Sequence, residues 1–382
     1  MASKFINFIN GVFGDKTPAP KPDSAETIKE VPPTKEDSKE SISFKEIKSI
    51  FSLHKKTGET LNTKTTVTST TETNVTKPTD ISVFAPVAQL KQEHYVVKTT
   101  ASGLQYEEKE LLLKATGINL SYDDKIILRD VNFEIKDVVR PGVQQGQVVA
   151  IVGQSGVGKS QLLKILAGLT EIPRNKSEKI KGRELTGQVL IGRGLKDVVS
   201  GDVGVITQDY LMFNHRTIQG NFNLAVAKNH TVSEKDKPDL IKMYVDKFSL
   251  SEHLNKYPLQ MSGGQRQRAS IIQQVLRGAE NLILDEPFSG LDIKMIAKTL
   301  SVLSSISMEN EDRTLIIVSH DIATACSISD HVFILGAEEG KPGATIKRKI
   351  DLMERDLAWH DLKTIKKNPV FLQTIEEIES LI

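Results

Sequence analysis

A glycine-rich run in the middle of the chain carries the residues with the clearest chemical role: Gly153, Gln154, Ser155, Gly156, Val157, Gly158, Lys159 and Ser160. Its G-x-x-x-x-G-K-[ST] spacing is that of a phosphate-binding loop, whose backbone N–H groups wrap the phosphates of a nucleotide. The β-branched stretch 148–152 indicates a buried strand before the loop, and 161–167 indicates a helix after it, with an N-terminus that favours anions. Lys159 is then expected to reach the β- and γ-phosphates, and the Ser160 hydroxyl to bind Mg²⁺. Because the flanking strand and helix argue against a chance glycine-rich turn, we predict that the chain binds a nucleoside triphosphate.

A second feature is an apolar strand pattern, 282–284, that ends in the carboxylates of Asp285 and Glu286. A buried strand of this kind delivers its last residues to the edge of the sheet where the phosphate loop also lies. Asp285 is predicted to hold Mg²⁺ through water, and Glu286 to orient or deprotonate an attacking water. Alone, such a pair would be read as a surface feature; downstream of a phosphate loop it predicts nucleotide hydrolysis.

A third feature is a second anion site just before a predicted helix at 264–277: Ser262, Gly263, Gly264 and Gln265. The two glycines permit close approach of the backbone, and Ser262 can cap the helix and donate to a phosphate. A single bound nucleotide does not require a second anion site in the same chain. The pattern therefore predicts that these residues complete the site of another subunit.

Together these features resemble the ATP-binding cassette (ABC) ATPases over roughly residues 111–350, with their motifs in the family's order. The signature motif of that family matches 262–265, with Met261 where leucine is usual. The resemblance also implies roles for single residues: adenine stacking for Tyr122, Mg²⁺ contact and communication with the partner domain for Gln208, dimer contact for Asp292, and γ-phosphate contact for His320.

The resemblance therefore predicts a complete set of site residues. Catalysis is expected from Glu286, His320 and Gln208, and metal binding from Ser160, Gln208 and Asp285. Nucleotide contacts are expected from Tyr122, residues 153–161, residues 262–265 and Asp292. Gln161 replaces the hydroxyl residue that commonly follows the phosphate-loop serine, so one phosphate contact is expected to differ. Apparent insertions at 138–145 and 174–184 change loop geometry and not the chemistry.

The implied fold is α/β: a P-loop NTPase of ABC type, with a mainly parallel sheet core, an antiparallel β subdomain and a helical subdomain. Alternating strand and helix patterns over 109–350 agree with it. Residues 1–108, rich in Ser, Thr, Lys, Glu and Pro, are predicted to form a disordered arm. Its amphipathic islands at 5–13 and 44–51 are either docking helices or residual amphipathicity. Residues 351–382 are predicted to be a C-terminal helical tail.

Composition narrows the function class further. Lys+Arg 50 against Asp+Glu 49 gives a net charge of +1, so no direct nucleic-acid partner is expected. A single cysteine, Cys326, excludes an internal disulfide framework and fits a reducing cytosol. No run approaches the roughly 18 apolar residues of a membrane span. We expect a cytoplasmic protein that is peripheral on the inner face of the membrane.

One cassette without a membrane span implies that two heads meet in trans, each giving its phosphate loop to one ATP and Ser262 to the other. Residues 211–218 resemble the permease-contact region of importer ATPases, closest to the nitrate/sulfonate/taurine group, with Met212 and Phe213 as exposed anchors. We therefore expect an ATP-hydrolysing importer subunit with ATP and Mg²⁺ as cofactors. Its expected partners are a second ABC subunit, forming a homodimer, and a membrane-spanning permease that determines the substrate.

The alternative is a soluble ABC ATPase that acts on a cytosolic partner. DNA-repair types split the cassette with a long coiled coil, and no sustained heptads separate Ser160 from Ser262. Translation types carry two cassettes in one chain, and this sequence has one. A regulator that binds ATP without hydrolysing it is disfavoured by intact Lys159, Glu286 and His320.

Overall fold

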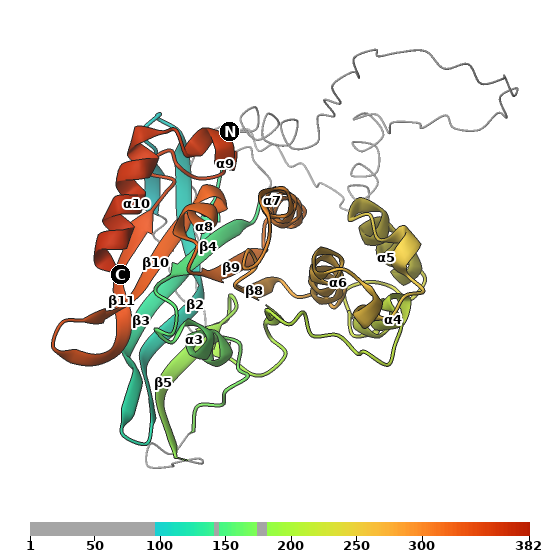
Figure 1. Cartoon of the computed structure of the whole chain (residues 1–382), viewed down its shortest axis with the longest axis horizontal. Coiled ribbons are helices and arrows are strands. Elements are labelled where there is room, and N and C mark those ends of the chain that lie inside the picture. The colour runs from blue at the N-terminus through green and yellow to red at the C-terminus, as the bar shows by residue number, and fades with distance from the viewer. Residues whose placement is uncertain (1–95, 141–144, 174–181) are drawn as a thin grey trace, which may run out of the picture. The chain divides into compact units, whose positions relative to one another are not determined.

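A computed structural model describes residues 96–140, 145–173 and 182–382 of the chain (Figure 1). The strands are β1 (Val96–Thr99), β2 (Gln105–Tyr122), β3 (Lys125–Val139), β4 (Gln147–Val152), β5 (Arg183–Ile191), β6 (Lys196–Asp197), β7 (Gly204–Ile206), β8 (Asn281–Asp285), β9 (Thr314–Ser319), β10 (His331–Glu338) and β11 (Lys341–Asp351). The helices are α3 (Lys159–Leu166), α4 (Ile218–Ala227), α5 (Lys237–Lys247), α6 (Gly263–Leu276), α7 (Ile293–Ser307), α8 (Ile322–Ile328), α9 (Leu362–Ile365) and α10 (Pro369–Leu381), with short 3-10 turns η2 (Ser251–His253) and η3 (Pro258–Gln260). Both predicted islands of the arm lie outside the described residues, as do residues 141–144 and 174–181 of the apparent insertions.

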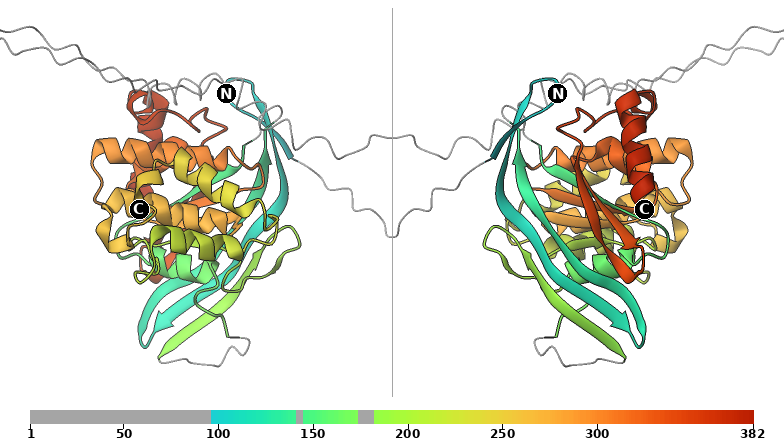
Figure 2. Two further views of the ribbon diagram at one scale, coloured as in Figure 1. Left: turned by 90° about the vertical axis from the view of Figure 1, so that its right-hand side faces the viewer. Right: turned by 90° about the vertical axis from the view of Figure 1, so that its left-hand side faces the viewer.

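The described strands form an 11-stranded sheet in the order β6-β5-β2-β3-β11-β10-β4-β9-β8-β7, with β1 beside β2. Strands β10, β4, β9, β8 and β7 are parallel neighbours. Strands β1, β2, β3, β5 and β6 pair in antiparallel fashion, and the long β2, β3 and β5 run side by side in Figures 1 and 2. The predicted parallel core with an antiparallel β subdomain is thus confirmed.

Apolar side chains cover both faces of the parallel strands. Along β4, Val148 and Val152 face one hydrophobic cluster, while Val149 and Ile151 face the other. Helix α3 packs on the second face through residues such as Leu162. Two buried faces explain why the sequence before the phosphate loop is an unbroken β-branched run, and this burial stabilises the strand on which the loop begins.

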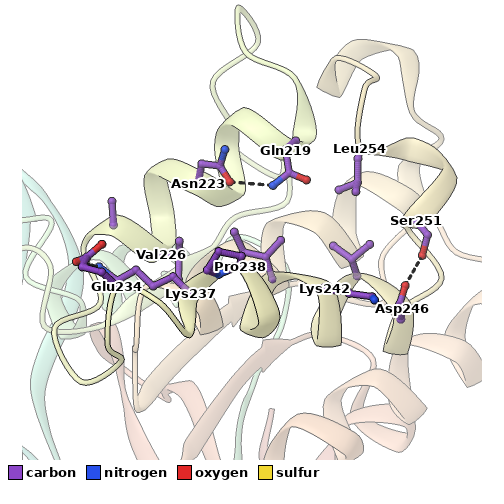
Figure 3. Close-up of a pocket in the computed structure, with 13 residues that line it drawn as sticks. Gln219, Asn223, Val226, Glu234, Lys237, Pro238, Lys242, Asp246, Ser251 and Leu254 are labelled. Atoms are coloured by element: carbon purple, nitrogen blue, oxygen red, sulfur yellow. Dashed lines mark hydrogen bonds and ion pairs between the residues drawn. The ribbon is translucent and has the colours of Figure 1, made fainter.

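The helical subdomain consists of α4, α5 and α6, which pack on one another and join the larger hydrophobic cluster. Thr217 caps α4 by accepting a hydrogen bond from the Gly220 N–H. A groove between α4 and α5 has apolar walls, including Val226 and Ile241, and a polar rim (Figure 3). Because α6 is packed within this layer, the predicted anion site at its N-terminus has a firm support.

Within the described ranges, no helix combines the length and the apolarity needed to cross a bilayer.

The strands of the domain include residues that the composition assigns to the arm. Strand β1 starts at Val96, and the Tyr106 side chain on β2 is only 1% exposed and packs in the larger cluster. The predicted boundary at 109 is therefore wrong. Within the segment 351–382, helices α9 and α10 follow a stretch of turns, and Trp359 and Phe371 are buried in the same cluster, so the segment packs as part of the domain.

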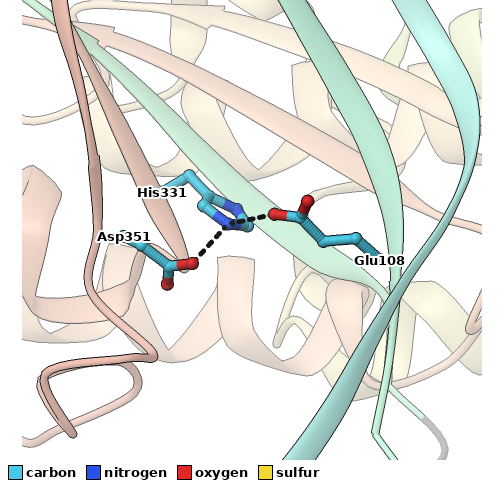
Figure 4. Close-up of side chains that lie close together, drawn as sticks. All are labelled: Glu108, His331 and Asp351. Atoms are coloured by element: carbon cyan, nitrogen blue, oxygen red, sulfur yellow. Dashed lines mark ion pairs between the residues drawn. The ribbon is translucent and has the colours of Figure 1, made fainter. Parts of the chain in front are cut away.

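A buried charge network fastens the first strands to the last ones (Figure 4). Glu108, His331 and Asp351 are, among the described residues, the group whose ligand-type atoms could hold a metal ion. The protein itself supplies the cation there: Lys98 Nζ donates to Glu108 Oε1 at 2.9 Å and to Asp351 Oδ2 at 3.1 Å. Tyr106 donates its hydroxyl to Asp351 Oδ2 at 2.7 Å. We therefore assign an ion-pair network that joins β1 and β2 to β10 and β11.

This network shifts the pKa values of its members. His331, with Lys98 and Lys349, holds the pKa of Glu108 well below its usual range. Burial on its own would raise the pKa of Asp351. The charge and hydrogen bond of His331 and the hydrogen bond from Tyr106 have the larger combined effect, so the pKa of Asp351 is lowered. Burial opposes the charge on His331, yet the two carboxylates raise its pKa. The carboxylates therefore contribute stability that is present above about pH 4 and lost on acidification, whereas the contribution of His331 is present below about pH 6.5 and lost as the pH rises.

We expect two truncated chains to differ sharply in stability. A chain starting at residue 96 keeps the network and should melt within a few degrees of the full chain. A chain starting at 109 lacks the buried Tyr106 and removes Lys98 and Glu108 from the network, so Asp351 loses two donors and His331 loses one of its two carboxylates. Losses of this kind each cost about 3–5 kcal/mol. Its melting temperature, followed by circular dichroism, should fall by about 10 °C or more. Equal melting of the two chains would refute the role given to β1 and β2.

Candidate active site

The predicted catalytic residues, Tyr122 and most of residues 153–161 line one pocket at the carboxyl ends of the parallel strands. Its lining comes from separate segments of the chain: Tyr122, Ile127, Ser155, Gly156, Gly158, Lys159, Ser160, Gln161, Gln208, Glu286, Ser289 and His320. Most of these segments follow the parallel strands β4, β7, β8 and β9, whereas Tyr122 and Ile127 come from the antiparallel pair β2 and β3. Strands of a parallel sheet deliver their last residues to the same edge, which explains the convergence.

The phosphate loop, residues 153–160, joins β4 to α3 in a conformation that needs glycine. Gly156 and Gly158 have φ values of 80° and 110°, in the left-handed region that other residues rarely adopt. A Cβ at Gly153 would lie 2.3 Å from the Leu335 carbonyl oxygen. The Lys159 side chain is 6% exposed and its Nζ donates to the carbonyls of Gly153 and Gln154, at 2.9 and 3.0 Å. The loop thus folds around a cation, at a helix N-terminus, as an anion site requires.

The end of β8 brings a carboxylate against the loop. Ser160 donates its hydroxyl to Asp285 Oδ1 at 3.2 Å. Burial raises the pKa of Asp285, and neighbouring Glu286 adds to this, despite the Ser160 hydrogen bond and the Lys159 charge. A hydroxyl and a half-buried carboxylate beside another carboxylate are oxygen donors suited to Mg²⁺, which would relieve the repulsion.

Glu286 connects the loop lysine to His320. Its backbone has φ 50°, and its N–H donates to the Val318 carbonyl at 2.8 Å, which fixes the side chain at the edge of the sheet. Glu286 Oε1 lies 3.4 Å from Lys159 Nζ, and Oε2 lies 2.8 Å from His320 Nδ1. The Ser319 hydroxyl also donates to Oε2, at 3.2 Å. The carboxylate is therefore held inside the pocket, within reach of a water beside the loop.

Tyr122 and Gln161 form one wall of the pocket. Tyr122 is 37% exposed and donates its hydroxyl to Gln161 Oε1 at 3.2 Å. An exposed aromatic ring at the mouth of a phosphate site is suited to stacking on a base. The amide at position 161 thus contacts the tyrosine across the pocket.

The predicted second anion site lies elsewhere, at the start of α6. Ser262 caps this helix by accepting from the Gln265 N–H at 3.4 Å, and Gln265 Oε1 accepts from the Ser262 N–H at 2.9 Å. Ser262, Gly263 and Gly264, named here the nest, do not line the described pocket. Asp292 caps α7 by accepting from Met295 N, and the Met295 side chain packs against Gly264. The nest and Asp292 therefore share one surface, away from the phosphate loop.

The predicted anchors after Gln208 differ from each other. Phe213 is 45% exposed, as predicted, but Met212 is half-buried against the larger cluster, so the expectation of an exposed side chain is wrong for Met212. Two site residues were missed from sequence. Ser319 could have been found, because its hydroxyl ends a predicted strand directly before His320 and contacts Glu286. His253, which contacts Gln265, belongs to none of the recognised motifs.

Comparison with known proteins places the chain in a family. The family model described as ABC transporter matches residues 137–289. The glutamate transport ATP-binding protein of Corynebacterium glutamicum is 31% identical over 208 residues, which cover 54% of this chain and 80% of that protein. The aliphatic sulfonates import ATP-binding protein of Bacillus cereus is 31% identical over 224 residues, covering 59% and 79%. The nitrate import ATP-binding protein of Synechocystis sp. is 27% identical over 260 residues, covering 67% and 88%.

These relatives are matched over most of their length. The pocket combines a phosphate loop with the Glu286 carboxylate, and Asp285 at the end of β8 contacts the loop through Ser160. The chain belongs to the ATP-binding subunits of ABC transporters and is an ATPase.

Proposed function

We propose that the chain is the motor subunit of an importer-type ABC transporter and hydrolyses ATP between two copies of itself. The proposal is based on one observation: the nest does not line the pocket of its own chain. Each pocket would then lack a phosphate contact on its open side. A nest on another copy would complete the pocket, and reciprocal completion gives a symmetric pair. Asp292, which caps α7 beside the nest, would lie in the same contact.

ATP fits the pocket through its phosphates and its base. The backbone N–H groups of residues 153–160, the Lys159 ammonium and the start of α3 would hold the β- and γ-phosphates. Tyr122 would stack on adenine, oriented by Gln161. Ser262, Gly263, Gly264 and Gln265 of the partner copy would face the γ-phosphate from the open side.

Mg²⁺ fits the oxygen donors Ser160, Asp285 and Gln208, and when bound it would neutralise phosphate charge. Glu286 would orient the attacking water and accept its proton as the water oxygen bonds to the γ-phosphorus. The bond from the γ-phosphorus to the bridging oxygen breaks, and ADP leaves with that oxygen. His320 would hold the γ-phosphate. Lys159 Nζ, which lies 3.4 Å from Glu286 Oε1, would pair with the phosphates instead, and Glu286 would then be free to act as the base.

The importer assignment rests on the relatives and on the surface after Gln208. The relatives named above are import or transport subunits. The Phe213 backbone is held by Asn221, which accepts from its N–H at 2.9 Å and donates to its carbonyl at 3.2 Å, while the ring stays exposed. An exposed apolar side chain on a backbone held in place, a few residues after Gln208, is suited to contact with a membrane-spanning permease. The chain would then lie on the cytoplasmic face of the membrane.

We expect Phe213→Glu to lower recovery of the chain with membranes by about tenfold, because a buried contact would receive a charge. Nucleotide binding should not change, since Phe213 does not line the pocket. Leu372→Glu, at a 48% exposed position on α10, is the matched control and should behave as wild type. Recovery is measured by sedimenting membranes from producing cells. Unchanged recovery of Phe213→Glu would argue for the soluble alternative, and loss of ATP binding would show that the substitution disturbs the nucleotide site and not a separate docking surface.

A further inference from the structure

The nest is shaped by the side-chain amide of Gln265. The Ser262 N–H points at Gln265 Oε1, at 2.9 Å, and the Gln265 N–H points back at the Ser262 hydroxyl. An N–H donor needs an acceptor, so the oxygen of the amide must face Ser262. This leaves the amide NH₂ of Gln265 pointing away from the nest.

His253 receives that NH₂ group. Its Nε2 lies 2.8 Å from Gln265 Nε2. An amide NH₂ can only donate, so His253 Nε2 must accept, which requires a neutral imidazole with its proton on Nδ1. His253 Nδ1 is buried and makes no hydrogen bond within the described residues. The acceptor at Nε2 is therefore the polar contact through which this ring acts on the nest.

The backbone around His253 is firmly placed. Its N–H donates to the Leu250 carbonyl at 2.9 Å, and its carbonyl accepts from Lys256 at 3.0 Å. Arg268 on α6 donates its Nε to the Phe248 carbonyl at 3.1 Å, which ties the same loop to the helix that begins with the nest. The imidazole is thus presented to Gln265 by a fixed frame.

We propose that His253 is a positioning residue for the ATP site of the partner copy: it locks the Gln265 amide so that the nest keeps its phosphate-binding shape. The proposal rests on the proposed function, because the nest serves the other head. His253 therefore acts on assembly and turnover, and leaves the binding of ATP to the phosphate loop of its own head unchanged.

The hydrogen-bond chemistry sets the choice of variants. His253→Lys offers only donors, so the Gln265 amide must turn and set its NH₂ against the Ser262 N–H. His253→Leu removes the acceptor without adding a donor. His253→Gln restores an acceptor in the same place. Gln265→Leu removes the amide itself and tests the same contact from the other side.

The experiment uses the full chain and measures three quantities for each variant: affinity for a fluorescent ATP analogue, ATP-dependent dimerisation, and the steady-state rate of phosphate release. For His253→Lys we expect kcat to fall about tenfold, the effect of about one hydrogen bond. Affinity for the analogue should stay within twofold, and the melting temperature within a few degrees. His253→Gln should restore most of the rate. Adding Gln265→Leu to His253→Lys should cause no further loss beyond that of Gln265→Leu alone.

The negative results differ in which claim they would overturn. Wild-type turnover in His253→Lys, or equal losses in His253→Lys and His253→Gln, would overturn the inference alone. Additive losses in the double variant would overturn it as well, because the two residues would then act separately. A wild-type chain that binds ATP but never dimerises would overturn the proposed function and this inference with it.

Discussion

Replacing Glu286 by glutamine is expected to lower the rate of ATP hydrolysis by about 10²-fold or more while ATP binding is kept. The amide preserves the size of the side chain and its contacts with Ser319 and His320, which lie 3.2 and 2.8 Å from Oε2. What it loses is the negative charge that accepts a proton from the attacking water. The rate is measured as phosphate release at saturating Mg-ATP, and affinity by equilibrium titration.

The matched control for this variant is Glu280→Gln. Glu280 is an exposed carboxylate just before the opposite end of β8, where its backbone carbonyl accepts from Thr314. The substitution makes the same change of charge, remote from the pocket, and should leave turnover as in wild type. Wild-type turnover in Glu286→Gln would remove the assignment of Glu286 as the base.

Lys159→Ala is expected to weaken ATP binding itself, by about tenfold to a hundredfold. The buried ammonium is held by the loop carbonyls of Gly153 and Gln154, so its charge is already placed where phosphates bind. Charge-assisted hydrogen bonds of this kind contribute about 1.5–3 kcal/mol. Affinity is measured by titration with an ATP analogue. Lys164→Ala, at an exposed position of the same helix, is the control. Equal affinity in the Lys159 and Lys164 variants would show that the loop binds without its lysine.

The pocket could be predicted from sequence because its residues sit at the ends of locally recognisable elements. β4 is buried on both faces and reads as an apolar run, and Gly158 provides the positive φ that starts α3. The carboxylates follow a strand of the same kind, β8. For both the phosphate loop and the carboxylates, the residues that determine the local conformation are adjacent in the sequence.

The first strands could not be predicted in this way. Residues 105–108 are polar or charged apart from Tyr106, so by composition they are assigned to the arm. Glu108 is buried only because Lys98 and His331 neutralise it, and His331 lies on a strand more than half the chain away. His253 could not be predicted for the same reason, because its proposed role depends on a contact with Gln265 across a loop. Long-range pairing of charged and polar groups leaves no local pattern.

The claim that two heads share each ATP is tested most directly by sedimentation velocity of Glu286→Gln with and without Mg-ATP. This variant should bind ATP without consuming it, so the assembled state accumulates. We expect a monomer without nucleotide and a dimer with saturating Mg-ATP, with the dimer lost when Lys159→Ala is added. A variant that is saturated with ATP and still sediments as a monomer would show that the two heads do not share ATP.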